Sequence, residues 1–428
     1  MTDKTLKLGV AGLGNVGSGL VQLVQRQDSL RIPGRLEIAC VSARNRSRDR
    51  GVDISNYAWF DDPSDLAASD DIDVFVELVG GSDGPAKKSV EIALESGKSV
   101  VTANKALIAE HGLELAARAE RSDAHLLFEA AVAGGVPIVR AIRDSLAGVE
   151  VERVSGILNG TCNYILTEML TSGAAYTDVL ADAQRLGYAE ADPYLDVSGM
   201  DAAHKIVILA AMAFKAKPDF SKVSVAGVDQ IDALDISLAD RLGYRVRLIA
   251  EAKFANGGVS CGVSPVLFPV NHPLAQVGGP LNAVLVDGDP VGRLTFTGPG
   301  AGAGPTASAV LGDIARLFHG PATAPFGVAA STLVDRFIAS SDGGAPSAYF
   351  IRARLTDKSG AMAALSDALA SSGVSIDTLH QDSGGESGAA PIALVTHPCS
   401  RTEAEAAVKK AKALDASVDA PQLIRIEA

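Results

Sequence analysis

The chain has 428 residues, of which 47% are apolar and 21% charged, and its formal net charge is −13. At roughly 150 residues per domain, this length predicts two or three domains, each large enough to bury its own core. The apolar fraction excludes a disordered chain, and the acidic excess argues against nucleic acids and anionic membranes as partners.

The four cysteines are far apart in the sequence and form no C-x-x-C pair. This spacing argues against a disulfide framework or a zinc knuckle and is typical of a reducing cytosol. The N-terminus shows no signal-peptide pattern, and the most apolar later stretch, residues 206–214, is shorter than the roughly 18–20 residues of a membrane span. We therefore expect a cytoplasmic protein without a membrane segment.

Residues 1–135 alternate short apolar strands with helices. Strands are expected at residues 6–10, 36–41, 74–79, 99–102 and 126–129, with helices after the first strand and at about 85–96 and 112–121. Because each strand is almost entirely apolar, the pattern indicates a parallel sheet covered by helices on both faces. We predict a Rossmann domain, that is, a doubly wound parallel α/β sheet.

The pattern changes after Pro137. Residues 136–340 mix strands and helices and predict an α+β domain, although a helix expected after Thr306 can pack back on the first domain. Residues 341–347, S-D-G-G-A-P-S, are the best linker candidate. Residues 348–428 then follow the order strand–helix–strand–strand–helix–strand, which predicts a ferredoxin-like βαββαβ unit.

A G-x-G-x-x-G motif follows the first strand and opens the first helix. Gly12 permits the tight turn, Gly14 lets the backbone approach a pyrophosphate, and Gly17 lets the helix pack on the strand. The backbone amides of Asn15 and Val16 then belong to a helix start that can hold the anion. This context favours a dinucleotide site over a glycine turn without a ligand.

The end of the second strand bears on the choice of cofactor. NAD sites place an acidic residue there for the ribose 2′-hydroxyl, but residues 41–48 contain no carboxylate. Arg44, helped by Arg46 or Arg48, can instead pair with the 2′-phosphate of NADP. The pattern favours NADP, while NAD and a merely solvated basic loop stay open. Gly302, in a second glycine-rich run, is a further candidate for cofactor contact or a simple turn.

Several stretches, in the same order, resemble the homoserine dehydrogenase family. They are V-T-A-N-K at 101–105, E-A-A-V-A-G-G-V-P at 129–137, G-I-L-N-G-T-C-N-Y at 156–164, L-G-Y-A-E-A-D-P at 186–193 and G-M-D-A-A-H-K at 199–205. Residues 348–428 resemble an ACT domain, the amino-acid-sensing unit of many such enzymes, although Ser359-Gly360 replaces the usual proline–glycine pair. The resemblance implies NAD(P)-dependent interconversion of L-homoserine and L-aspartate 4-semialdehyde, on the route to threonine and methionine.

The resemblance implies two catalytic lysines. Lys205 matches the family's proposed acid/base lysine, and Asp201, four residues earlier on the same expected helix face, matches an acid that contacts substrate. The residues alone favour a plainer interpretation, a surface ion pair with Ser198 and Asp201 as a capping box. Lys105 follows the fourth strand, at the sheet edge where ligands bind, and would lie between nicotinamide and substrate. Its alternative is a loop lysine at a helix start.

Other matched positions imply contacts with substrate and cofactor. Glu190 matches the glutamate that meets the substrate ammonium, a role that suits a carboxylate because a desolvated zwitterion needs an anionic partner. Asp196 matches an aspartate of less certain role. Thr161 lies in the substrate-side loop, where its hydroxyl can reach the substrate carboxylate or merely form a turn. Gly187 is expected at the cofactor.

Segments similar to residues 129–136 hold a monovalent cation, usually sodium, in the family, mostly through backbone carbonyls. The matching positions are Glu129, Val132, Gly134 and Val136, and an ordinary glycine-rich hinge is the alternative. The seven histidines lack the H-x-H or H-x-x-x-H spacing of a zinc or iron site, and His204 is expected to be incidental.

Two other functions stay open at this stage. One is a Rossmann oxidoreductase of another small amino or hydroxy acid, and another is an amino-acid sensor whose dehydrogenase half is inactive. A thioester mechanism at Cys162 is not favoured, since no partner histidine is nearby in the sequence. The resemblance further implies a homodimer or homotetramer with L-threonine as effector at the ACT domain.

Overall fold

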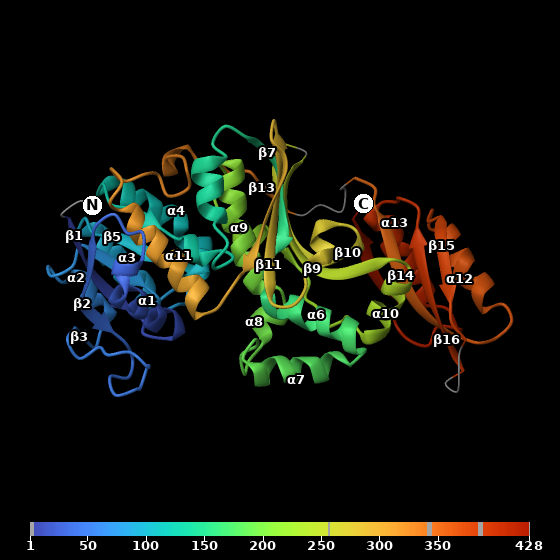
Figure 1. The fold of residues 1–428 in the computed structure, drawn as a ribbon. Coiled ribbons are helices and arrows are strands. Elements are labelled where there is room, and N and C mark those ends of the chain that lie inside the picture. Colours follow the sequence, from blue (N-terminus) through green and yellow to red (C-terminus); the bar gives the residue numbers. More distant parts are fainter. Residues whose placement is uncertain (1–3, 256, 340–344, 384–387, 428) are drawn as a thin grey trace.

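The computed structural model describes residues 4–255, 257–339, 345–383 and 388–427. The chain forms three parts in a row: an N-terminal sheet covered by helices, a central sheet and a C-terminal unit (Figure 1). Residues 341–344 of the expected linker lie outside the described residues.

The first part is built on a sheet of six parallel strands in the order β3-β2-β1-β4-β5-β6. Its strands are β1 (Thr5–Ala11), β2 (Arg35–Ser42), β3 (Ala58–Phe60), β4 (Val74–Glu77), β5 (Ser99–Thr102) and β6 (Leu126–Leu127). The order reverses between β1 and β4, which is the doubly wound arrangement, so the predicted Rossmann fold is confirmed. The sequence pattern missed β3, a three-residue strand at the sheet edge whose residues are only partly buried.

Five helices belong to this sheet. They are α1 (Asn15–Gln25), α2 (Pro63–Ala68), α3 (Pro85–Glu95), α4 (Lys105–Arg121) and α11 (Ala303–Arg316). The helix α11 comes from much later in the chain but packs against α1 (Figure 1). A Cβ atom at Gly19 would lie only 3.0 Å from the carbonyl oxygen of Ala303, so this close approach depends on glycine.

The second sheet has mixed strand directions and runs in the order β12-β11-β7-β9-β10-β17-β14-β16-β15, with β8 and β13 also paired to β10. Its central strands are β7 (Glu150–Ile157), β8 (Ser224–Val225), β9 (Tyr244–Ala255), β10 (Gly258–Pro269), β11 (Leu281–Asp289), β12 (Gly292–Pro299) and β13 (Phe337–Ile338). The helices of this part are α5 (Ile138–Arg140), α6 (Gly160–Ser172), α7 (Tyr176–Leu186), α8 (Tyr194–Val197), α9 (Met200–Phe214) and α10 (Ala233–Arg241).

The helix α9 lies at the centre of the molecule. It packs on β7, β9 and β10 and also against α4 of the first part. All its residues from Asp201 to Met212 are buried, which explains the apolar run without a membrane. Among the described residues, no helix is both long and apolar enough to cross a bilayer.

The C-terminal unit has the predicted βαββαβ order. Its elements are β14 (Ala348–Thr356), α12 (Ala361–Ala370), β15 (Ile376–Gln381), β16 (Ala389–Thr396), α13 (Arg401–Lys412) and β17 (Gln422–Ile426). Its last strand joins the central sheet, because β17 pairs in parallel with β10 at Val266–Arg425 and Leu267–Ile426. One sheet therefore crosses the boundary between the two parts (Figure 1).

A buried ion pair reinforces this boundary. Arg352 on β14 donates from Nε to Oδ1 of Asp235 on α10 at 2.8 Å, and both side chains are almost inaccessible to solvent. Removing one partner of such a pair leaves a charge buried without compensation, which typically costs about 3–5 kcal/mol.

We expect Arg352→Met to lower the free energy of unfolding of the C-terminal unit by about 3 kcal/mol, since Asp235 loses its buried partner. Arg354→Met is the matched control on the same strand face, because Arg354 and its partner Asp419 are each about one-third exposed and such pairs contribute about 0–1 kcal/mol. Denaturant titration followed by circular dichroism measures both, and equal losses would contradict the assignment.

Candidate active site

The glycine turn forms as the motif predicts. Gly12 has a φ of +99°, and a Cβ atom there would lie 2.3 Å from the carbonyl oxygen of Leu78. A Cβ atom at Gly17 would lie 2.0 Å from the carbonyl oxygen of Gly12, whereas Gly14 faces open space. The helix α1 begins at Asn15 without a side-chain cap, so its first amides are available to an anion. The residues therefore fit a dinucleotide pyrophosphate.

A cleft of about 690 Å³ extends from this turn along the end of β2. Arg44 and Arg48 line it, whereas Arg46 does not line it and instead lies over the ring of Trp59, 5.7 Å from its centroid. Arg50, which the sequence did not single out, organises the loop: its guanidinium donates to the carbonyl oxygens of Leu13, Asn45, Arg46 and Arg48. The cleft thus presents two of the three candidate arginines.

A second cleft of about 570 Å³ lies between the Rossmann sheet and the central part of the chain. It brings together most of the predicted site residues, which lie far apart in the sequence: Val16, Lys105, Gly134, Thr161, Gly187, Glu190, Asp196, Asp201, Lys205 and Gly302. Asn15 lines a smaller neighbouring cleft, and Arg44 lies in the cleft beside β2. We call the second cleft the catalytic cleft.

Asp201 joins the two candidate lysines in this cleft. Its Oδ2 atom lies 2.7 Å from Nζ of Lys205, and its Oδ1 atom lies 2.8 Å from Nζ of Lys105. Lys205 also donates to the carbonyl oxygen of Leu158 at 2.7 Å. The arrangement requires α4 and α9 to meet, because Lys105 is the first residue of α4 and the other two lie near the start of α9.

The plainer interpretation of this helix start is wrong. The N-cap of α9 is Gly199, with a φ of +86°, and no side chain caps the helix. The hydroxyl of Ser198 is buried without a partner among the described residues, and the Asp201 carboxylate is directed to the lysines instead. Neither Asp201 nor Lys205 is a surface residue, since each is less than one-tenth exposed.

The three charged groups have different pKa shifts. Burial lowers the pKa of Lys205 below its ordinary value, and Lys105 adds to this effect while Asp201 opposes it. The more exposed Lys105 has a raised pKa, because the attraction of Asp201 exceeds the effect of burial. Burial alone would raise the pKa of Asp201, but the two ammonium groups hold it well below the usual range. Lys205 is therefore the lysine that can lose a proton more readily.

Asn159 bridges the carboxylates of the cleft, a role that its position in the sequence did not reveal. Its Nδ2 atom donates to Asp196 at 2.8 Å and to Asp201 at 2.9 Å. Its Oδ1 atom accepts from the amide of Cys162 and caps α6, so the amide group cannot flip. Burial raises the pKa of Asp196, and the bond from Asn159 opposes this shift.

The remaining substrate-side residues lie on the wall formed by residues 186–190. The hydroxyl of Thr161 donates to the carbonyl oxygen of Tyr188 at 2.6 Å and so anchors this wall to α6. Gly187 ends α7 in the left-handed conformation, and Glu190 follows on the cleft surface. Cys162 is fully buried and burial raises the pKa of its thiol, which argues against a nucleophile.

The segment expected to hold a cation is tied to α11 and α5. Both carboxylate oxygens of Glu129 accept backbone amides, from Val139 at 3.0 Å and Arg140 at 2.8 Å, and its own amide donates to Asp313 at 2.8 Å. Burial and the nearby Asp313 raise the pKa of Glu129 to about 7. Asp313 was not predicted, because 184 residues separate the two and no local pattern marks it.

Within this segment, Gly134 lies against Gly300, whose carbonyl oxygen would be 2.5 Å from an added Cβ atom. The carbonyl oxygens of Glu129 and Val136 already accept amides, from Val132 and Ile138. Among the described residues, the side chains that could jointly hold a metal ion are Asp83, Glu110 and His111, outside this segment. His204 stacks on Phe220 and does not line the catalytic cleft, in agreement with an incidental role.

A Rossmann sheet with a glycine turn, beside a cleft with a partly desolvated lysine pair, defines a nicotinamide-dependent oxidoreductase. Residues 12–129 match the family model of the homoserine dehydrogenase NAD-binding domain, residues 137–315 that of homoserine dehydrogenase, and residues 349–416 that of the ACT domain. The chain belongs to the homoserine dehydrogenases.

Individual relatives agree over the whole length. A homoserine dehydrogenase of Neisseria gonorrhoeae is 38% identical, with 99% of each chain covered. The crystal structure of a homoserine dehydrogenase from Thiobacillus denitrificans superposes with a TM-score of 0.90 at 38% identity, covering 99% of this chain and 98% of that one. A hyperthermophilic archaeal homoserine dehydrogenase in complex with NADPH has a TM-score of 0.64 at 26% identity and covers 74% of this chain. The alternatives of another substrate or an inactive sensor are not favoured.

We expect Asn159→Asp to lower kcat by roughly tenfold to a hundredfold, which corresponds to about 1–3 kcal/mol for lost bonds to buried charges. The variant keeps an oxygen to cap α6 but replaces the donor to Asp196 and Asp201 with a third carboxylate. The added negative charge should also raise the pKa of Lys205, so the rise of the homoserine oxidation rate with pH should move to higher pH. Steady-state pH profiles measure both effects.

Asn159→Ser is the matched control for charge, since it retains a capping hydroxyl and removes the amide donor without adding a carboxylate. It should lower kcat but leave the rise of the rate with pH near its original position. A wild-type kcat and pH profile for the Asp variant would contradict a bridging role for Asn159.

Proposed function

We propose that Lys205 is the proton acceptor and donor of the reaction. It takes the hydroxyl proton of L-homoserine during oxidation and gives a proton to the carbonyl oxygen of L-aspartate 4-semialdehyde during reduction. The observation that carries this proposal is the buried contact of its ammonium with Asp201 in the catalytic cleft. Because burial lowers the pKa of Lys205, the neutral amine that oxidation needs is present at lower pH than for an ordinary lysine. The bound nicotinamide supplies or accepts the hydride.

Lys105 serves as the second cation at the reacting oxygen. It is about 40% exposed and has a raised pKa, so it stays charged and can polarise the carbonyl without releasing its proton. Asp201 holds both lysines in place and contacts the substrate. Glu190 accepts the substrate ammonium, and Asp196 is a further substrate-binding residue in the same cleft. The hydroxyl of Thr161 holds the wall at Tyr188, on the side of the substrate carboxylate.

We infer that the cofactor is NADP: Arg44 and Arg48 would hold its 2′-phosphate, and the amides that follow Gly14 would hold its pyrophosphate. Val16, Gly187 and Gly302, which line the catalytic cleft, would hold the nicotinamide end. The complex of the archaeal relative with NADPH supports this choice.

Further proposals concern regulation and assembly. The chain is a homodimer or homotetramer in the cytoplasm, which sedimentation and fractionation test.

Sodium binds at the carbonyls of Glu129, Val132, Gly134 and Val136, and activity measured after exchange of sodium for a bulky organic cation tests this. The domains are residues 1–135, 136–340 and 348–428, and α11 packs with the first domain. Limited proteolysis should cut mainly between these ranges, and cleavage mainly inside them would argue against these domain boundaries.

We expect Lys205→Ala to lower kcat by about 10²–10⁴-fold, the usual contribution of general acid–base catalysis, with little change in the Kd of NADP. Small primary amines added to the variant should restore part of kcat, because they fit the space left by the side chain and can carry the proton. Equal losses in kcat and NADP affinity, without rescue, would make Lys205 a structural residue.

For the wild-type enzyme, the rate of homoserine oxidation should rise with pH along a limb centred below the ordinary lysine pKa. The same limb should be absent from the Lys205→Ala profile.

We expect Arg44→Asp to weaken NADP binding by roughly tenfold to a hundredfold, since a charge-assisted bond contributes about 1.5–3 kcal/mol, and to improve the use of NAD. Arg46→Ala is the control, because Arg46 lies on Trp59 outside the cleft. Comparing kcat/KM for the two cofactors measures the change. An unaltered ratio in the Arg44 variant would rule out the 2′-phosphate contact.

L-Threonine is proposed as the effector of the ACT domain. We expect it to inhibit homoserine oxidation in the full chain, which a titration of initial rates measures. Rates that do not change up to saturating threonine would remove this proposal.

A further inference from the structure

A third cleft, of about 240 Å³, lies at the seam between the central sheet and the ACT domain. One wall comes from β8, β9 and β10, and the other from the residues around the starts of β14 and α13 together with β17. None of the residues that line it also lines the catalytic cleft or the cleft beside β2. We call it the seam cleft.

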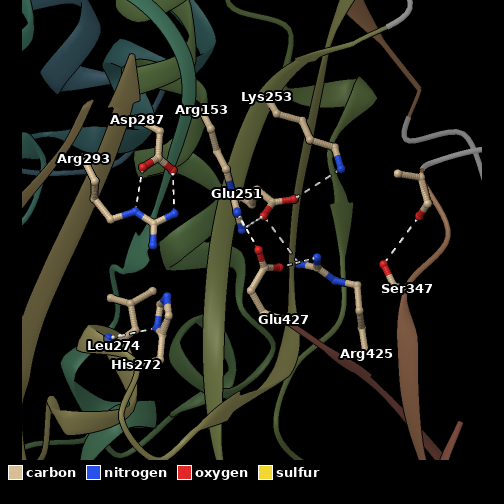
Figure 2. Close-up of polar contacts among 11 residues, drawn as sticks. Arg153, Glu251, Lys253, His272, Leu274, Asp287, Arg293, Ser347, Arg425 and Glu427 are labelled. Carbon is tan, nitrogen blue, oxygen red and sulfur yellow. Dashed lines mark hydrogen bonds and ion pairs between the residues drawn. The ribbon is translucent and has the colours of Figure 1, made fainter. Parts of the chain in front are cut away.

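Glu251 belongs to a network of five charged side chains at this cleft (Figure 2). Glu251 contacts Arg153, lies 3.5 Å from Nη2 of Arg425 and lies 3.8 Å from Nζ of Lys253. Glu427 in turn pairs with Arg153 at 2.6 Å and with Arg425 at 2.7 Å. Three cationic and two anionic side chains leave one positive charge in surplus.

Lys253 carries most of this surplus. Among the described residues, its ion-pair contact is the 3.8 Å approach to Glu251, which is too long for a hydrogen bond, and its side chain is 38% exposed. The other basic residue of the wall, Arg401, is balanced by Glu405 at 2.7 Å. The ammonium of Lys253 is therefore directed to a cleft that lacks a matching anion among the described residues.

Hydroxyl groups line the same cleft. Ser260 and Ser264 on β10 and Ser224 on β8 contribute to its wall, and their hydroxyls form no hydrogen bond to other described residues. Ile249 and Ile338 add an apolar surface. Donors beside a cation, with an apolar wall, are the features of a site for a small organic anion.

We propose that the seam cleft binds a small monocarboxylate. A single negative charge matches the single surplus charge, whereas the second charge of a dianion such as a phosphate ester would be repelled by Glu251, which lines the cleft. The Oε1 atom of Glu251, whose ion-pair contact is the loose one to Lys253, can also accept an ammonium group. Both α-amino acids and simple hydroxy acids offer this carboxylate, and a bound molecule would contact the central sheet and the ACT domain together.

Acylation of lysines in the full-length protein by an N-hydroxysuccinimide ester, followed by peptide mass spectrometry, tests the proposal at one residue. L-Alanine, L-lactate and inorganic phosphate are the probes. At about ten times Kd a site is roughly 90% filled, so acylation of Lys253 should fall by about tenfold. Lys217, whose side chain is also 38% exposed but pairs with Asp335, is the internal control, and Lys105 reports on the catalytic cleft.

Protection of Lys253 by alanine and lactate alike supports a carboxylate site, and protection by alanine alone supports one that also uses Glu251 for the ammonium. Calorimetry should then detect binding to the wild type and to Lys217→Gln but not to Lys253→Gln. No protection of Lys253, or equal protection by phosphate, overturns the proposal. Because Lys105 is measured in the same sample, this outcome is separate from any failure of the proposed catalytic roles.

Discussion

The carboxylate of Asp201 is the contact on which the rest of the arrangement depends. It holds two ammonium groups, one from each of two helices, in a place where an uncompensated charge would be strongly destabilising. One helix, α4, belongs to the Rossmann sheet, and the other, α9, packs on the central sheet. The two parts must therefore meet at this carboxylate, so the same contact that assembles the cleft also fixes the relative position of the two sheets.

The two lysines share Asp201 as a partner, and the difference in their pKa shifts comes from their different burial. Both contact Asp201 at nearly the same distance, yet the pKa of Lys205 is lowered and that of Lys105 is raised. Lys205 lies within a helix that is covered on all sides, whereas Lys105 lies at a helix start that opens to the cleft. One shared anion thus supports a lysine suited to proton transfer and another suited to remain charged.

The sequence predicted those features that depend on local patterns, namely the strand–helix alternation, the glycine turn and the βαββαβ order. It missed β3, whose three half-exposed residues give no periodicity, and it could not choose between Arg46 and Arg48, because the position of Trp59 decides that choice. The contacts of Asn159 with Asp201 and of Glu129 with Asp313 join residues 42 and 184 positions apart. Such pairings follow from the packing of whole elements, which a short motif does not encode.

The pairing of β17 with β10 gives the ACT domain a second role, as a cover for a strand edge. At Val266 and Leu267 the backbone of β10 would otherwise present unpaired amide and carbonyl groups beside a largely apolar strand, a surface that invites association with other chains. We expect a shortened protein that ends before the ACT domain to associate with other chains through this exposed edge. The C-terminal unit consequently covers this particular strand edge of the central sheet, independently of any molecule that it binds.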